Sequence, residues 1–517
     1  MVNPLSLAHN RILKISIFAT GCAGIVAEFV LSTLASYLIG NPILQWTIVM
    51  SLMLFAMGLG SRASRYITRN LLDKFIIIEF TLSIICALSV SLCYWLATFS
   101  QNTSLAIYSL SLVVGLLIGV EIPIVTRINE SYEDLKTNIS SVLENDYYGA
   151  LAGGLLFAFF ALPYLGLTYT PIALGIINFA VASVLYHRYK HLINHKRILK
   201  TSFWGATLFF AVFIIAVKPI ILYSEQKKYK DKIIFQTQSK YQKIVMTQWK
   251  DDYWLFINGK EQFSTFDEVK YHEPLVHPPM LLAKQKRDVL ILGGGEGLAA
   301  REVLKYDEVQ SVTVVDLDPA MTTLSKNHPV ITAINENSMN DLRVKIINKD
   351  GFIFLENNKE RYDIIIVDLP DPSSVSLSRL YSREFYSLCK HHLNKHGAII
   401  TQATSPVYAG KAFTCIIKTM EASGFTVLPY QNHIPTLGEW GWCLGVREEV
   451  STKEQLKKSI MKLSFTNINT KFLNNNAVIS MTHFGKGILE IENDVKINTI
   501  LNPVLTTYYK NGEWDVY

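Results

Sequence analysis

The chain has 517 residues, 50% of them hydrophobic, and a formal net charge of +6. This length exceeds that of one ordinary domain. No basic patch interleaved with aromatic residues stands out, which argues against a nucleic-acid-binding protein. The hydrophobic excess lies before about residue 225, so we expect an apolar amino-terminal part and a carboxy-terminal part of mixed composition.

Seven long apolar runs precede residue 225. About 20 apolar residues suffice to cross a bilayer, so we predict an all-α polytopic membrane domain of about seven helices over residues 1–225. Its partner is the lipid bilayer and its location the cell membrane. The acidic residues Glu28 and Glu121 lie within runs and should face the interior of the bundle. The runs are Ile15–Leu38, Leu44–Leu59, Phe75–Ala97, Leu105–Val125, Tyr148–Leu165, Tyr169–Tyr186 and Phe203–Tyr223.

Basic residues flank the amino terminus and the even-numbered linkers, for example Arg62 and Arg65 after the second run. Such residues favour the cytoplasm. Seven spans would then place the carboxy-terminal part outside the cell. The basic segment Lys227–Lys232 after the last run favours the cytoplasm instead. Either one run is re-entrant or the carboxy-terminal part faces outward.

Beyond the apolar runs the pattern changes three times. Alternating polar and apolar residues, with Asn258-Gly259 between two strand-like runs, predict a small β-hairpin domain over residues 226–285. Residues 286–450 alternate strands with helices and predict an α/β Rossmann domain of the methyltransferase-like kind. Residues 451–517 are rich in lysine and asparagine and are expected to form a peripheral helical extension.

Four strand-like runs of the Rossmann region end in glycines or carboxylates. They read DVLILGGGEG, SVTVVDLD, KIINKDG and YDIIIVDLPDP. Ligands bind such sheets at the carboxyl ends of the strands. The acids there should therefore converge on one crevice and bind a hydroxylated, cationic ligand. They are Glu296, Asp316, Asp350, Asp368 and Asp371. The alternative is an ordinary β-α-β core whose acids are solvated turn residues.

The glycine loop Gly293–Gly297 lacks the last glycine of a dinucleotide fingerprint, and no Lys-Ser/Thr follows it. Asp316 suits a ribose diol, and Asp350 could accept from an adenine amine. Adenosine without phosphates indicates an S-adenosyl compound. Glu296 would attract the ammonium of the decarboxylated donor and repel the carboxylate of the intact one. A unit charge pair at about 4 Å is worth roughly 4 kcal/mol at an effective dielectric constant near 20.

Taken in order, the segments SKYQKI, DEVKYHEPLVHPPM, LILGGGEG, VVDLD, NKDG, DLPDP and IPTLGEWGW resemble the polyamine aminopropyltransferase (spermidine synthase) family. The stretch LFAMGLGSRASRY resembles the family's membrane-fused members. The resemblance implies a catalytic aspartate at Asp368 and acceptor-binding residues at Tyr271 and Asp371. It implies donor-binding residues at Gln242, His272, Glu296, Asp316, Asp350 and Gly351.

The sequence departs from the family pattern mainly on the acceptor side. Leu369 and Pro370 stand where small hydroxyl residues are usual, and Leu437 stands where a tyrosine is common. These departures weaken the assignment of putrescine more than that of the donor. Glu296 replaces the usual aspartate, which lengthens the side chain by one methylene.

The resemblance implies transfer of the aminopropyl group of decarboxylated S-adenosylmethionine to putrescine or a similar diamine, giving spermidine and methylthioadenosine. No tightly bound cofactor and no metal are expected, since the six cysteines form no CxxC or Cys/His cluster. We expect the catalytic domain to face the cytoplasm, because the donor is made there. The protein could also form a homo-oligomer. The alternatives are an amine methyltransferase that uses S-adenosylmethionine and a non-catalytic polyamine transporter or sensor.

Overall fold

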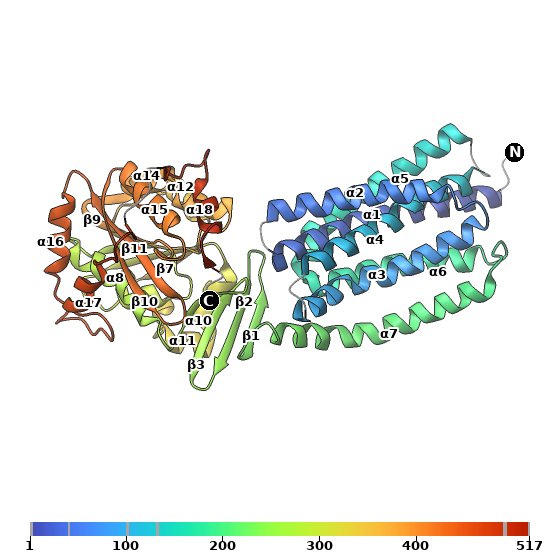
Figure 1. Ribbon diagram of the computed structural model, residues 1–517. Helices are drawn as coiled ribbons and strands as arrows, with labels where there is room; N and C mark the ends of the chain where they lie inside the picture. The colour runs from blue at the N-terminus through green and yellow to red at the C-terminus, as the bar shows by residue number, and fades with distance from the viewer. Residues whose placement is uncertain (1–3, 40–41, 100–102, 131–133, 490–493, 515–517) are drawn as a thin grey trace. The chain divides into compact units, whose positions relative to one another are not determined.

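The computed structural model describes residues 4–39, 42–99, 103–130, 134–489 and 494–514. The chain forms two compact units, Met1–Lys232 and Ile233–Tyr517. The first is helical, and the second combines two sheets with helices (Figure 1).

Seven α-helices and one π-helical stretch make up the described part of the first unit. Six helical ranges are long and apolar enough to cross a membrane, because α5, η1 and α6 form one 54-residue range, Leu135–Arg188. The helical geometry of this range breaks at Gly166, where φ is +62°. The elements are α1 (Pro4–Ile39), α2 (Pro42–Ser64), α3 (Leu71–Phe99), α4 (Thr103–Asn129), α5 (Leu135–Leu156), η1 (Phe157–Leu165), α6 (Gly166–Arg188) and α7 (Lys196–Gln226).

Acidic side chains lie inside this bundle, as expected for Glu28 and Glu121, which are 7% and 2% exposed. The sequence analysis did not single out Glu79, which is fully buried on α3. Neither carboxylate oxygen of Glu79 has a hydrogen-bond partner among the described residues. Burying such groups is costly, so these acids are a distinctive feature of the helical unit.

A four-stranded antiparallel sheet opens the second unit. It has the order β1-β2-β3-β4, with β1 (Lys232–Gln238), β2 (Lys243–Trp249), β3 (Asp252–Ile257) and β4 (Lys260–Ser264). The expected hairpin is confirmed: β3 pairs with β4, and Asn258 and Gly259 have positive φ. Helix α8 (Val269–Leu282) follows this sheet.

The larger sheet has seven strands in the order β10-β11-β9-β8-β5-β6-β7. Strands β9 to β7 are parallel, and β11 and β10 add antiparallel partners at one edge. Successive strands leave β5 in opposite directions, so the switch point lies between β5 and β8. The strands are β5 (Asp288–Gly293), β6 (Ser311–Asp316), β7 (Val344–Asn348), β8 (Tyr362–Asp368), β9 (Leu393–Gln402), β10 (Phe425–Ile434) and β11 (Gly438–Arg447). The predicted Rossmann-like class of this region is confirmed.

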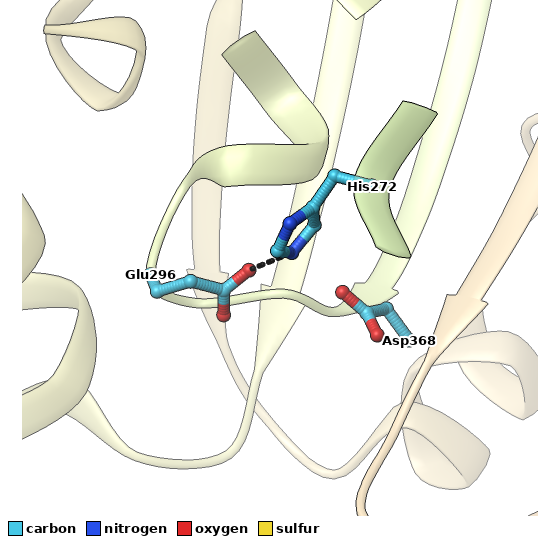
Figure 2. A group of neighbouring side chains, drawn as sticks. All are labelled: His272, Glu296 and Asp368. Atoms are coloured by element: carbon cyan, nitrogen blue, oxygen red, sulfur yellow. Dashed lines mark ion pairs between the residues drawn. The ribbon is translucent and has the colours of Figure 1, made fainter. Parts of the chain in front are cut away.

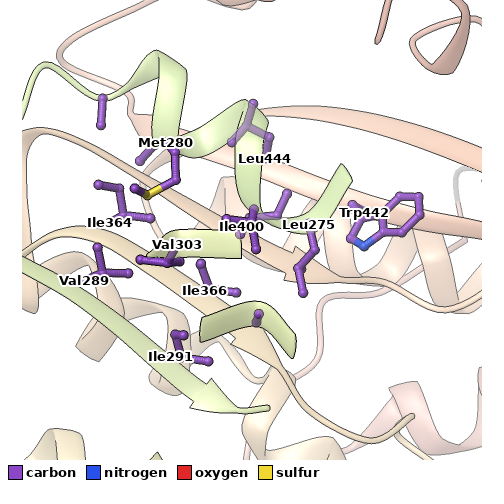
Figure 3. Close-up of a cluster of buried hydrophobic side chains, with 14 of the residues drawn as sticks. Leu275, Met280, Val289, Ile291, Val303, Ile364, Ile366, Ile400, Trp442 and Leu444 are labelled. Carbon is purple, nitrogen blue, oxygen red and sulfur yellow. The ribbon is translucent and has the colours of Figure 1, made fainter. Parts of the chain in front are cut away.

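Alternate residues of each strand supply the cores on the two faces of this sheet. Val289 and Ile291 of β5 pack in one cluster with residues of α8 and of α9 (Leu298–Val303), and Trp442 of β11 lies at the other end of this cluster, next to Leu275 (Figure 3). Leu290 and Leu292 point to the other core. That core includes residues of α12 (Gly351–Asn357), α14 (Arg383–His392) and α15 (Gly410–Ala422). Shorter helices are α10 (Pro319–Asn327), α11 (Pro329–Ile334), η2 (Ser338–Asn340), α13 (Val375–Ser378) and η3 (Arg379–Tyr381).

The carboxy-terminal segment is integral to the second unit, so the expectation of a peripheral extension is wrong. It contains α16 (Lys453–Met461), α17 (Asn475–Met481) and α18 (Val504–Lys510). Leu456 belongs to one core of the sheet and Leu505 to the other. The few apolar residues among many lysines and asparagines concealed this burial, because the helices are short and their partners are distant in sequence.

Candidate active site

The glycine loop and the end of β8 are joined through their backbones. Gly293 pairs with Asp368 across the parallel strands, and the Gly294 N–H donates to the Asp368 carbonyl at 3.1 Å. Gly293 has a φ of +85°, and a Cβ there would collide with the Asp368 carbonyl. Only glycine fits this close approach without strain. The loop therefore brings Glu296 close to Asp368, at the carboxyl ends of the strands where a crevice for a ligand is expected.

Tyr271 and Asp368 form the central contact of this crevice. The buried Tyr271, on α8, donates its hydroxyl to Asp368 Oδ1 at 2.7 Å. Burial raises the pKa of Asp368 to about 7, and Glu296 adds to the rise, while His272 and Tyr271 oppose it. A carboxyl group with a pKa near neutrality is suited to proton transfer.

His272 lies between Glu268 and Glu296. Figure 2 shows its ring beside Glu296 and Asp368. Its Nδ1 lies 2.9 Å from Glu268 Oε2, and its Nε2 lies 3.7 Å from Glu296 Oε1. Burial disfavours the charged imidazole, but Glu268 and Glu296 outweigh it and raise the pKa of His272 to about 10. Arg301 Nη2 donates to Glu268 at 2.9 Å. His272 therefore carries a positive charge among the acids at neutral pH.

One ligand atom each from His272, Glu296 and Asp368 lies within 4.8 Å of the others, a spacing that a metal ion could bridge. A protonated imidazole has no lone pair for a metal. Because the pKa of His272 is raised, a metal ion would have to displace a proton from this ring before it could bind there.

Glu296 Oε1 is buried and has no hydrogen-bond partner among the described residues. Its nearest counter-charge is His272, at ion-pair distance. An acceptor oxygen left in this way is the kind of group that a ligand donor satisfies. Glu296 thus points to a cationic or hydrogen-bond-donating ligand.

Asp316, at the end of β6, lies on the other side of the glycine loop. Its Oδ1 accepts the Asp318 N–H at 2.8 Å, and burial raises its pKa to about 6. Asp318 Oδ2 accepts from Ser239 Oγ at 2.6 Å. The same Ser239 oxygen accepts the Gln242 N–H at 3.0 Å, so this network ties the loop of Gln242 to the end of β6.

Asp350 follows β7, the next strand of the sheet, and begins α12. Its Oδ1 accepts the N–H groups of Phe352 and Ile353, and its Oδ2 pairs with Arg379 Nη2 at 2.6 Å. Gly351 is the first residue of that helix. Asp350 thus shapes a helix terminus at the edge of the crevice.

Asp371 has a separate environment. Its Oδ2 accepts from the Tyr509 hydroxyl at 2.9 Å, and its Oδ1 lies 3.4 Å from Gln402 Nε2. Burial raises its pKa, which Lys260 and Tyr509 partly offset. Sequence reasoning missed Gln402, Tyr509 and Lys260, because no motif surrounds them and they are far apart in the chain.

The structure thus joins Tyr271, His272, Glu296, Asp316 and Asp368 into one electrostatic network. Of the remaining expected residues, Gln242, Asp350 and Asp371 lie on loops and make the contacts given above, and Gly351 begins α12. In a Rossmann-like sheet the ligand binds at the switch point, and the acids gathered there suit a hydroxylated, cationic ligand such as an S-adenosyl compound.

Comparison with known proteins narrows this class. Residues 268–458 match the spermine/spermidine synthase domain family. The polyamine aminopropyltransferase 2 of Aquifex aeolicus is 44% identical over 505 residues, covering 97% of this chain and 99% of the relative. The polyamine aminopropyltransferase of Oceanobacillus iheyensis is 37% identical over 529 residues, and the match covers 100% of both chains. The chain therefore belongs to the polyamine aminopropyltransferase family and is a transferase of polyamine biosynthesis.

A crystal structure of spermidine synthase in complex with the transition state analogue AdoDATO is also similar, with a TM-score of 0.45 and 24% identity. The match covers 49% of this chain and 86% of that one. The family assignment rests on the two sequence relatives.

Proposed function

We propose that the enzyme transfers the aminopropyl group of decarboxylated S-adenosylmethionine to putrescine or a similar diamine. The products are spermidine and methylthioadenosine. Asp368 is the general base, Tyr271 orients the attacking nitrogen, and Asp371 holds the far end of the acceptor. The donor is bound by Gln242, His272, Glu296, Asp316, Asp350 and Gly351.

The observation that carries the choice of donor is Glu296 Oε1, a buried oxygen that accepts no hydrogen bond from the described residues and has only the longer ion-pair contact with His272. The ammonium of the decarboxylated donor would satisfy this oxygen, whereas the carboxylate of intact S-adenosylmethionine would be repelled. Since Asp368 lies in the same small cluster, the aminopropyl arm would end within reach of the base. An amine methyltransferase would also have to accommodate the carboxylate of its donor, which a negatively charged Glu296 disfavours.

The proposed reaction is a single displacement. The neutral amine nitrogen forms a bond to the methylene carbon beside the sulfonium, and the C–S bond breaks with its electron pair going to sulfur. The attacking nitrogen passes its proton to Asp368. Releasing the lone pair of an alkyl amine at pH 7 costs about 4 kcal/mol, so a base in contact lowers the barrier.

The charge of the donor would itself activate the base. Asp368, with a pKa of about 7, is partly protonated at neutral pH before the donor binds. The donor brings a sulfonium and an ammonium, and nearby cations favour the ionised form of a carboxyl group. Asp368 would therefore lose its proton as the donor binds.

The nucleoside would lie across the ends of β6 and β7. Asp316 would accept from the ribose hydroxyls, and Asp350 and Gly351 would meet the adenine. The oxygens of Asp350 contact the start of α12 and Arg379, yet a carboxylate offers about four lone-pair sites and can accept further bonds.

One experiment tests the donor and the reaction together. Purified full-length protein is incubated with each donor and a panel of amines, and the products are identified by mass. Formation of spermidine and methylthioadenosine from the decarboxylated donor supports the proposal. Methylated amines would support the methyltransferase alternative, and amine binding without turnover would support a transporter or sensor.

We further propose that residues 1–225 span the cell membrane several times and that the catalytic domain faces the cytoplasm. Within the catalytic part, residues 226–285 would form the small β domain and residues 286–450 the Rossmann-like domain, and residues 451–517 pack into the cores of its sheet. The apolar helices support the first point, and the basic segment Lys227–Lys232 supports the second.

A cysteine-labelling experiment tests this orientation. All six native cysteines are buried, whereas Leu342 is fully exposed. Leu342→Cys should therefore give a single reactive thiol. It should resist an impermeant thiol reagent in intact cells and react after lysis. Labelling in intact cells would place the domain outside.

A further inference from the structure

Two residues from distant segments meet at Asp371. Tyr509 lies on α18 of the carboxy-terminal segment, and Lys260 lies at the start of β4, just after the Asn258-Gly259 turn. The Tyr509 hydroxyl donates to Asp371 Oδ2 at 2.9 Å, and the Lys260 ammonium donates to the same hydroxyl at 3.2 Å. Tyr509 therefore links a buried carboxylate to a positive charge.

The packing around Tyr509 fixes this arrangement. The Trp514 ring lies 4.8 Å from the Tyr509 ring, and Trp514 Nε1 donates to the Tyr509 carbonyl at 2.8 Å. Lys260 Nζ also lies 5.1 Å from the centre of the Tyr509 ring, a cation–π contact. Although Lys260 as a residue is exposed, these contacts hold its ammonium beside the acid.

We infer that Lys260 and Tyr509 form the far wall of the acceptor site and that Lys260 selects against acceptors with a charge beyond the second nitrogen. The inference deepens the proposed function and rests on it. A diamine would place its far ammonium at Asp371, with Lys260 beyond. A triamine would carry a third ammonium toward Lys260, where like charges repel.

This arrangement has a direct consequence for the product. Spermidine is a triamine, so the same repulsion would keep the product from serving as the next acceptor. Specificity of this kind comes from an unfavourable contact with the wrong ligand. The Tyr509 hydroxyl contributes by holding the ammonium in place and by occupying one oxygen of Asp371.

Lys260→Gln tests the inference, because it keeps length and polarity but removes the charge. We expect the ratio of kcat/KM for spermidine to kcat/KM for putrescine to rise at least about tenfold. Inhibition by added spermidine should strengthen in parallel. Lys260→Arg keeps the charge and should keep the wild-type ratio.

Lys250→Gln is the matched control, because Lys250 is also a turn lysine of the small sheet, near the ring of Trp249. In this variant the ratio of kcat/KM for spermidine to kcat/KM for putrescine should not change. Tyr509→Phe should shift the ratio in the same direction as Lys260→Gln, by freeing the ammonium. If Tyr509 is only structural, the kcat/KM values for both amines would fall together and the ratio would stay constant.

An unchanged ratio in Lys260→Gln, with normal donor binding, would overturn the inference. Failure of the proposed function looks different: the wild-type protein would then transfer no aminopropyl group to either amine. Donor binding measured by calorimetry on every variant shows that the fold is intact.

Discussion

Tyr271 donates its hydroxyl to Asp368 Oδ1 at 2.7 Å, which fixes the carboxylate at the end of β8. Asp368→Asn keeps the size of the side chain and an oxygen that can accept this bond, but it removes the carboxylate that we propose as the base. We expect donor affinity to stay near that of the wild type and kcat to fall by roughly 10²–10⁴. Steady-state kinetics and calorimetry measure the two quantities. Turnover at the wild-type rate would remove Asp368 from the mechanism.

The pKa of Asp368 predicts the acid limb of the pH profile. The base works only when ionised, so kcat/KM should fall as the pH drops below about 7. Bound donor favours the ionised form, and the limb of kcat should therefore lie at lower pH than that of kcat/KM. Glu296→Gln removes a negative neighbour and should move the kcat/KM limb to lower pH. If the acid limb of kcat/KM does not move in Glu296→Gln, a group other than Asp368 controls this limb.

Glu296→Gln also tests the choice of donor. The variant removes the charge but keeps the size and the hydrogen-bonding capacity of the side chain. Affinity for decarboxylated S-adenosylmethionine should fall by roughly 10- to 100-fold. Affinity for intact S-adenosylmethionine should hold or rise, because a repulsion has been relieved. Calorimetric titration with both donors measures this. If both affinities fall together, Glu296 merely shapes the loop.

Asp316 should affect the donor and not the acceptor. If Asp316 binds the ribose hydroxyls as proposed, Asp316→Ala should raise the donor KM by roughly 10- to 100-fold. Asp316→Asn is the matched variant, since it can still accept the Asp318 N–H and should keep the loop in place. We expect the donor KM to rise moderately in Asp316→Asn and more strongly in Asp316→Ala. An unchanged donor KM in both would place the nucleoside elsewhere.

Glu273 on α8 anchors the carboxy-terminal segment. It is fully buried and accepts the N–H groups of Lys471, Phe472 and Leu473 at 2.6, 2.9 and 2.7 Å. Glu273→Ala would leave three donors unpaired and should cost about 3 kcal/mol or more of stability.

Hydrogen exchange at residues 471–473 should accelerate in this variant. Glu308→Ala, at an exposed side chain, is the control and should change little. Unchanged exchange in Glu273→Ala would mean that the segment is held by its apolar contacts alone.

The sheet was predictable because local signals agreed with the tertiary structure. Apolar strands such as Val289–Leu292 end in glycine or acid, and that pattern alone locates Glu296 and Asp316 at strand ends. The pairing of Gly293 with Asp368 follows from parallel register, which the motif order implies.

Contacts between remote segments were not predictable in this way. Tyr509 is 138 residues from Asp371 in the sequence, and no motif around either residue predicts their contact. The hydrogen bonds of Glu273 span about 200 residues. The expected peripheral extension failed for the same reason, since burial there comes from partners that a local pattern does not reveal.

The acids around Glu296 and Asp368 also bear on how a catalytic cycle ends. The proposed donor enters with two positive charges, but its nucleoside product, methylthioadenosine, is neutral because the sulfonium has become a thioether and the ammonium has left with the amine. The site would therefore lose most of its electrostatic attraction for the nucleoside when the aminopropyl group is transferred. The transfer reaction would thus promote release of methylthioadenosine, which should be a weak inhibitor. Its binding should also depend far less on salt concentration than that of the donor.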